Sequence, residues 1–159
     1  MRAAVLTIST SVSARQAEDR SGPALAARAE GAGCSIEAME VVPDDLALIE
    51  DRLRHYVEEG FDVVLTTGGT GFTPDDVTPE ATRMVVERLA PGITEAMRAV
   101  SLAHTPMAVL SRAVAGIADA TLIVNFPGSP KAVEECFGVL EPVLPHAVRT
   151  LRGESRHGH

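Results

Sequence analysis

An apolar run that leads directly into a glycine-rich stretch limits the folds that this chain can adopt. Residues 61–67 read FDVVLTT, and the Val-Val-Leu centre is apolar at consecutive positions. A strand with one solvent-exposed face alternates apolar and polar residues. A continuous apolar run is typical of a parallel strand that is buried on both faces. Parallel strands need crossover connections, which are usually helices. The run therefore predicts an α/β domain.

Segments typical of strands and of helices alternate along the chain. Apolar, β-branched runs predict strands over residues 3–9, 35–42, 61–67, 113–117 and 121–126. Helical spacing and start signals predict helices over residues 21–32, 44–59, 78–89, 91–103 and 129–152, the last bent at Pro142 or Pro145. The last two strands are joined too closely for a parallel crossover, so we expect them to be antiparallel. The predicted fold is a three-layer α/β domain with a mostly parallel sheet, helices on both faces and one antiparallel strand.

Composition restricts the partners and the location. The chain has 159 residues, of which 45% are hydrophobic, so we expect one domain over residues 1–152 and a disordered polar tail over residues 153–159. The net charge of -8 disfavours nucleic acid or an anionic membrane as the main partner. There is no signal-peptide layout and no membrane-length apolar run, which favours a soluble cytoplasmic protein. Cys34 and Cys136 are expected to be free thiols.

Two loops are candidate phosphate-binding sites, because ligands of α/β sheets bind beyond the carboxyl ends of the strands. Gly68-Gly69-Thr70-Gly71 would let a phosphate approach the backbone closely, although a tight strand-to-helix turn explains the glycines equally well. Neither the P-loop nor the dinucleotide motif fits this stretch. The loop Pro127-Gly128-Ser129-Pro130-Lys131 opens a helix and offers N–H groups, a hydroxyl and a mobile cation. Taken alone, that loop fits an N-cap serine and a solvated lysine better.

Two aspartates are candidate metal ligands. Asp44 follows the second predicted strand, and Asp76 follows the glycine-rich stretch. Together they would hold Mg²⁺ against phosphate oxygens. Either residue is also suited to be the N-cap of the helix that follows it. Ser111-Arg112 is a weaker candidate for binding a phosphate, because the ordinary role of such an arginine is a surface salt bridge.

Taken together, these stretches resemble the molybdopterin adenylyltransferase family, which includes the gephyrin G domain. The resemblance covers nearly the whole chain and runs through VLTIST, EDRSGP, VVPDD, LTTGGTGFTPDDVTPEAT, PGITEAMR, LSRAVAGI and NFPGSPKAVEECF. It implies a three-layer α/β domain, usually a homotrimer, that transfers AMP from ATP to the terminal phosphate of molybdopterin and releases pyrophosphate. It also implies Mg²⁺ as cofactor, with ATP as co-substrate, and a downstream molybdenum-insertion protein as a further partner.

The resemblance also implies a role for each candidate residue. Asp76, in the family's D-V-T-P-E segment, and Asp44 would be catalytic and would hold Mg²⁺. The nucleotide would lie against Gly68, Gly69, Thr70 and Gly71. Molybdopterin would bind at Ser111, Arg112, Pro127, Gly128, Ser129 and Lys131.

Two positions differ from the family pattern. A basic residue commonly precedes the catalytic aspartate, where this chain has Asp75, and the family's S-D-S after the first strand reads Ser9-Thr10-Ser11 here. Each change alters the charge near two polyphosphates. The main alternative is therefore a non-catalytic molybdopterin-binding or scaffolding paralogue. A third hypothesis is another nucleotide or pterin reaction, as in competence-damage-type proteins of the same fold.

Overall fold

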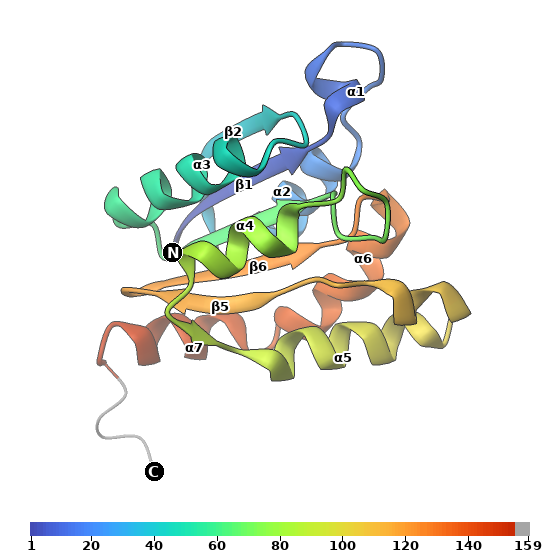
Figure 1. Cartoon of the computed structure of the whole chain (residues 1–159). Coiled ribbons are helices and arrows are strands. Elements are labelled where there is room, and N and C mark those ends of the chain that lie inside the picture. Colours follow the sequence, from blue (N-terminus) through green and yellow to red (C-terminus); the bar gives the residue numbers. More distant parts are fainter. Residues whose placement is uncertain (155–159) are drawn as a thin grey trace.

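A six-stranded sheet forms the centre of the computed structural model, which describes residues 1–154 (Figure 1). The strands lie in the order β2-β1-β3-β6-β5-β4. Neighbours among β2, β1, β3 and β6 are parallel, and β5 is antiparallel to both β6 and β4. This confirms the predicted, mostly parallel sheet with one antiparallel strand. The strands are Arg2–Ile8 (β1), Ser35–Val42 (β2), Val63–Thr67 (β3), Arg88–Leu89 (β4), Ala115–Ala118 (β5) and Thr121–Phe126 (β6).

Helices cover both faces of the sheet, which confirms the three layers (Figure 1). One face packs against α3 (Leu46–Glu58) and α4 (Thr78–Val85). The other face packs against α2 (Ser21–Gly31), α5 (Pro91–Leu102), α6 (Pro130–Leu140) and α7 (Leu144–Leu151). Two short helices, α1 (Thr10–Ser13) and the 3-10 helix η1 (Pro106–Leu110), lie in connections. Among the described residues, no helix combines the length and the apolar character needed to cross a membrane.

Strand β3 is buried on both sides, and this explains why its sequence does not alternate. Val63, Val64 and Leu65 have no exposed surface. Val63 and Leu65 belong to the core on the α2 and α6 side, whereas Val64 belongs to the core on the α3 and α4 side. Complete burial of one such side chain contributes roughly 1.5–3 kcal/mol. The carboxyl end of β3 therefore has a fixed position, and the glycine loop begins there.

The predicted helix over residues 78–89 is too long. It ends at Val85, and residues 88–89 instead form the edge strand β4. Val86 already has an extended backbone, and the N–H of Glu87 donates to the carbonyl of Ile117. Pairing with β5 therefore overrides the local helical pattern. The strand predicted over residues 113–117 is shifted to residues 115–118.

The closing helix predicted over residues 129–152 is two helices. It breaks near Pro142, which has no N–H and whose ring clashes with the preceding turn of a helix. Pro145 is instead tolerated in the first turn of α7.

In the predicted tail, residues 153 and 154 form hydrogen-bonded turns after α7, and residues 155–159 lie outside the described residues. Cys34 and Cys136 are buried and free, as predicted.

An ion pair connects the C-terminal end of α7 to the start of the sheet. Asp62 accepts hydrogen bonds from the Arg152 Nη2 at 2.5 Å and Nε at 3.0 Å, and from the Arg2 main-chain N–H at 2.7 Å. Burial raises the pKa of the Asp62 carboxyl, but the hydrogen bonds outweigh burial and the net shift is downward. This carboxylate therefore stabilises the fold fully above its unfolded pKa of about 3.9, and the contribution is lost as the pH falls through the lowered folded pKa.

We expect Arg152→Met to lower the free energy of unfolding at neutral pH, because Asp62 would keep its burial and lose its cation. The difference from the wild type should shrink at acidic pH, where the wild-type carboxylate becomes protonated as well. Urea unfolding of both proteins at pH 7 and at acidic pH measures this difference. A difference that does not change with pH would contradict the assigned role of Asp62.

Candidate functional site

The two predicted phosphate-binding loops touch each other where β3 and β6 end. The N–H of Gly68 donates to the carbonyl of Phe126 at 3.1 Å, and the Thr67 hydroxyl donates to the carbonyl of Pro127 at 2.7 Å. A Cβ atom on Gly128 would lie 3.4 Å from the Cα of Gly68. The glycine loop and the loop over residues 127–131 therefore form one continuous surface.

The protein's own packing already requires the first two glycines. Gly68 has φ +102° and Gly69 has φ +68°, a region that side chains rarely adopt. A Cβ on Gly68 would overlap the carbonyl oxygen of Ile8, and a Cβ on Gly69 would overlap the Thr78 hydroxyl. The interpretation as a tight turn is therefore confirmed, and contact of this turn with a nucleotide stays a prediction.

Thr78 bonds the glycine turn to the start of α4. Its hydroxyl donates to the carbonyl of Gly68 at 2.9 Å, and its N–H donates to the carbonyl of Gly69 at 3.2 Å. The N-cap of α4 is Val77, which makes no side-chain capping bond. Thr78 therefore serves the turn rather than the cap.

Asp44 is not the N-cap of α3. That position belongs to Asp45, whose Oδ1 accepts from the N–H of Leu48 at 3.0 Å. Asp44 Oδ2 instead accepts from the Thr10 N–H at 3.1 Å and from the Thr10 hydroxyl at 3.0 Å. Asp44 Oδ1 lies 3.1 Å from the position of a Cβ on Gly69. One carboxylate oxygen is thus held by Thr10, and the other lies next to the glycine turn.

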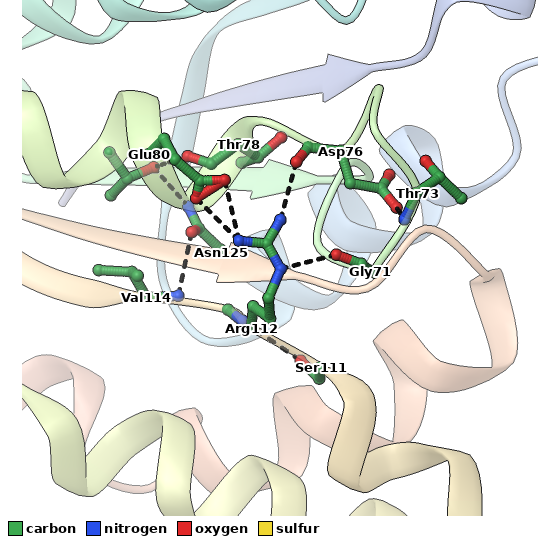
Figure 2. Close-up of polar contacts among 11 residues, drawn as sticks. Gly71, Thr73, Asp76, Thr78, Glu80, Ser111, Arg112, Val114 and Asn125 are labelled. Carbon is green, nitrogen blue, oxygen red and sulfur yellow. Dashed lines mark hydrogen bonds and ion pairs between the residues drawn. The ribbon is translucent and has the colours of Figure 1, made fainter.

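Asp76 also makes no cap. Its Oδ2 accepts from the N–H of Thr73 at 2.9 Å, within the loop that leads to α4 (Figure 2). The same oxygen lies 2.9 Å from the position of a Cβ on Gly71. The glycine turn is therefore bordered by two carboxylates, Asp44 beside Gly69 and Asp76 beside Gly71. Within residues 1–154, no three or more His, Cys, Asp or Glu side chains are grouped so that they could hold a metal ion.

The Arg112 guanidinium connects both ends of the loop over residues 71–76 (Figure 2). Nε donates to the carbonyl of Gly71 at 2.8 Å, and Nη2 donates to the carbonyl of Asp76 at 2.8 Å. Nη1 donates to both carboxylate oxygens of Glu80, at 2.9 and 2.8 Å. All three nitrogens are engaged, so Arg112 positions the loop. The contact with molybdopterin that the resemblance implies for Arg112 and Ser111 stays a prediction.

The buried side-chain amide of Asn125 connects the segments next to this loop. Asn125 has no exposed surface, and its Nδ2 donates to the hydroxyls of Thr66 at 3.0 Å and Thr82 at 2.9 Å. Its Oδ1 accepts from the N–H of Val114 at 3.0 Å (Figure 2). The network ties β6 to β3, to α4 and to the segment that follows Arg112. Asn125 is not among the candidate residues predicted from the sequence, although a lone amide in the apolar run TLIVNF is a usable signal.

The loop over residues 127–131 has a serine N-cap and a free cation. Ser129 Oγ accepts from the N–H of Ala132 at 3.1 Å, which confirms the capping interpretation and leaves its O–H able to donate. Lys131 is exposed and makes no hydrogen bond or ion pair with the described residues. It is also the only lysine of the chain.

Two cavities flank these loops. A cavity of about 270 Å³ is lined by Gly68 and Gly128 and by the polar segment of residues 18–21. A mostly apolar cavity of about 340 Å³ is lined by Gly71 and Pro127 and opens between α5 and α6. The larger volume lies within the range of small-molecule sites, and the smaller one lies just below it. The two loops therefore lie between a cavity of mixed polarity and a mostly apolar one.

Comparison with known proteins gives matches over most of the chain. Residues 4–146 match a family model described as a probable molybdopterin binding domain. The chain is 43% identical over 162 residues to gephyrin of Dictyostelium discoideum, covering 96% of this chain and 23% of that protein. It is 44% identical over 115 residues to the molybdopterin adenylyltransferase of Helicobacter pylori, covering 72% of this chain and 65% of that enzyme. The chain thus spans less than two thirds of either relative's length.

A solved structure shows the same fold. The molybdopterin biosynthesis enzyme MoaB of Thermus thermophilus superposes with a TM-score of 0.90 at 44% sequence identity, and the match covers 96% of each chain.

Proposed function

The chain belongs to the molybdopterin-binding domain family, and we propose that it acts in molybdenum cofactor biosynthesis as a molybdopterin adenylyltransferase. The observation that carries this proposal is the glycine turn bordered by Asp44 and Asp76 and in contact with the loop over residues 127–131. The relative from Helicobacter pylori, which bears that name, supports it.

In the proposed reaction, an oxygen of the terminal phosphate of molybdopterin attacks the α-phosphorus of ATP, and the bond to the β-phosphate breaks to release pyrophosphate. Both reactants are anionic, so catalysis depends on positioning and on neutralisation of charge. Lys131 and the N-terminus of α6 would bind the phosphate of molybdopterin. The backbone N–H groups of residues 69–71 would bind the phosphates of ATP. No covalent enzyme intermediate is required.

The two carboxylates fit Mg²⁺, which typically takes one or two protein carboxylates together with phosphate oxygens. Bound with ATP, Mg²⁺ would neutralise charge on the phosphates. Asp44 and Asp76 would hold it, while Thr10 and Thr73 keep the two carboxylates in place through their hydrogen bonds.

The direct test combines the purified protein, molybdopterin, ATP and Mg²⁺. The proposal expects adenylated molybdopterin and one pyrophosphate for each product formed. Molybdopterin that binds but is not adenylated would contradict the proposed reaction.

One observation favours a second candidate, a molybdopterin-binding scaffold without catalysis. Thr10 stands where the family pattern has an aspartate. It donates two hydrogen bonds to Asp44 Oδ2, so this oxygen is already engaged. Asp75 adds an exposed negative charge next to Asp76. The adenylation test separates the scaffold from the enzyme.

We expect Lys131→Ala to weaken molybdopterin binding by roughly 1.5–3 kcal/mol, the value of a charge-assisted hydrogen bond. Stability should hardly change, because the side chain is exposed. Calorimetric titration with molybdopterin measures the loss, and Lys131→Arg, which keeps the charge, serves as the matched control. Unchanged affinity in the alanine variant would remove Lys131 from the site.

We also expect a homotrimer. Large apolar side chains are exposed near the apolar cavity, with Phe72 at 66%, Met107 at 63% and Val109 at 61% of their full accessibility. Such surfaces are usually covered in an assembly. Light scattering at micromolar concentration should give three times the mass of one chain, and a monomer would contradict the expectation.

A further inference from the structure

Thr10 and Asp44 are joined by reciprocal hydrogen bonds, although 34 residues separate them in the sequence. The N–H and the hydroxyl of Thr10 both donate to Asp44 Oδ2, at 3.1 and 3.0 Å, and the Asp44 N–H donates to the Thr10 hydroxyl oxygen at 3.1 Å. Next to this pair, the N–H of Ser9 donates to the carbonyl of Val42 at 2.9 Å. The start of α1 is therefore tied to the segment after β2, and the Asp44 carboxylate is held in one orientation.

This orientation leaves one oxygen of Asp44 available. Among the described residues, no donor contacts Asp44 Oδ1 and no ion pair includes Asp44. Oδ1 is the oxygen beside the glycine turn, 3.1 Å from the position of a Cβ on Gly69. Asp76 has the same arrangement, because its Oδ2 accepts from the N–H of Thr73 and no donor within residues 1–154 contacts its Oδ1. Each carboxylate at the turn thus has one engaged oxygen and one available oxygen.

The two carboxylates differ in what holds the engaged oxygen. At Asp76 the donor is the main-chain N–H of residue 73, which every residue type except proline supplies. At Asp44 one of the two donors is the Thr10 hydroxyl, so the side chain at position 10 decides how firmly this carboxylate is held. A carboxylate held at one oxygen can coordinate a cation only through the other. A carboxylate that is free to turn can coordinate a cation with both oxygens.

Mg²⁺ and Ca²⁺ respond differently to such a restriction. Mg²⁺ demands near-ideal octahedral geometry and keeps several of its waters, so it needs few protein oxygens. Ca²⁺ takes more oxygens in flexible geometry and accepts both oxygens of one carboxylate. Selectivity between the two cations therefore depends on the number of ligand oxygens and on their freedom to move.

We propose that Thr10 determines the cation selectivity of the site. By holding Asp44 Oδ2, it limits Asp44 to one ligand oxygen and favours Mg²⁺ over Ca²⁺. Thr10 is a positioning residue, because it acts through Asp44 and does not itself contact the cation. The inference rests on the proposed function, because it takes Asp44 and Asp76 as the ligands of the cation.

The test measures cation binding to the full chain in the absence of both substrates. Mn²⁺ also suits octahedral oxygen sites, and it is titrated into the protein while the relaxation of water protons reports the bound ion. Asp44→Asn identifies the signal of this site, because the loss of charge should remove it. Mg²⁺ and Ca²⁺ then compete for the bound Mn²⁺ and give two dissociation constants. In the wild type, Mg²⁺ should be the stronger competitor.

Thr10→Val removes the hydroxyl and keeps the shape of the side chain and the main-chain N–H. The ratio of the Ca²⁺ to the Mg²⁺ dissociation constant should fall by about fivefold or more, the effect of losing one hydrogen bond to a charged group. Thr10→Ser keeps the hydroxyl and should retain the wild-type ratio. Ser13→Ala is the matched control, because it removes a hydroxyl of the same helix that does not contact Asp44. Thr10 is exposed, so the melting temperature should confirm that the valine variant is folded.

Four results would each overturn the inference. They are a wild-type preference for Ca²⁺, an unchanged ratio in Thr10→Val, the same change in Thr10→Ser as in Thr10→Val, and the lack of any saturable Mn²⁺ binding up to millimolar concentration that depends on Asp44. Because neither substrate is present, the selectivity can be measured whether or not the protein adenylates molybdopterin. Selectivity that depends on Thr10, in a protein that does not adenylate molybdopterin, would remove the proposed reaction and leave the role of Thr10 intact.

Discussion

An Asp76→Asn variant is expected to lose about a hundredfold or more in adenylation rate, which corresponds to roughly 2.7 kcal/mol or more of transition-state stabilisation. The reason is that the substitution removes the charge while keeping the shape. Asparagine retains an acceptor oxygen for the N–H of Thr73, which Asp76 Oδ2 engages at 2.9 Å. The loop should therefore persist and the melting temperature should move little. What is lost is half of the carboxylate pair proposed to hold Mg²⁺ beside the phosphates.

Pyrophosphate release at saturating substrates, together with thermal unfolding, measures both parts of this expectation. Asp75→Asn is the matched control, because Asp75 is the adjacent residue and its side chain is exposed. Asp75→Arg should tighten ATP binding and make it more sensitive to salt, since a cation replaces an anion near polyphosphate. Wild-type turnover in Asp76→Asn would remove its catalytic role. Molybdopterin binding without adenylation, in both the wild type and Asp75→Arg, would favour the scaffold.

Much of the fold could be predicted because its main elements have strong local patterns. The continuous apolar centre of β3 indicates burial on both faces, and that burial implies helices above and below. The elements that the sequence did not reveal depend on distant partners. Strand β4 has two residues and exists because it pairs with β5. The helix predicted across it follows a pattern that tertiary pairing overrides.

The meeting of the two candidate loops could be predicted for a similar reason, since β3 and β6 end at the same edge of the sheet and the loops after them lie together there. The different roles of neighbouring residues could not be predicted from the sequence. Asp44 and Asp45 are identical in type, and only the structure shows that Asp45 caps α3 while Asp44 lies beside the glycine turn. The hydrogen bonds of Arg112 could not be predicted either, because two of its partners are main-chain carbonyls, which leave no signal in the sequence.

Arg112→Lys is expected to lower adenylation by about a hundredfold, the cost of a displacement of about 1 Å in a positioned site. Lysine keeps the charge but lacks the planar fork that reaches several acceptors at once. It cannot bond simultaneously to the carbonyls of Gly71 and Asp76 and to the carboxylate of Glu80, as Arg112 does. The glycine turn and the Asp76 carboxylate should then lose their fixed relative positions. Arg83→Lys, on the exposed side of α4, is the matched control.

The kinetic constants separate this positioning role from direct contact with the substrate. If Arg112 acts through the loop, the lysine variant should lose kcat and raise the KM for ATP, while the KM for molybdopterin stays near the wild-type value. If Arg112 binds the phosphate of molybdopterin, lysine should replace it well, because an ammonium is also a good phosphate ligand. The remaining loss would then lie in the KM for molybdopterin. The three nitrogens already engaged with Gly71, Asp76 and Glu80 favour the first outcome, because a phosphate would have to displace at least one of these hydrogen bonds.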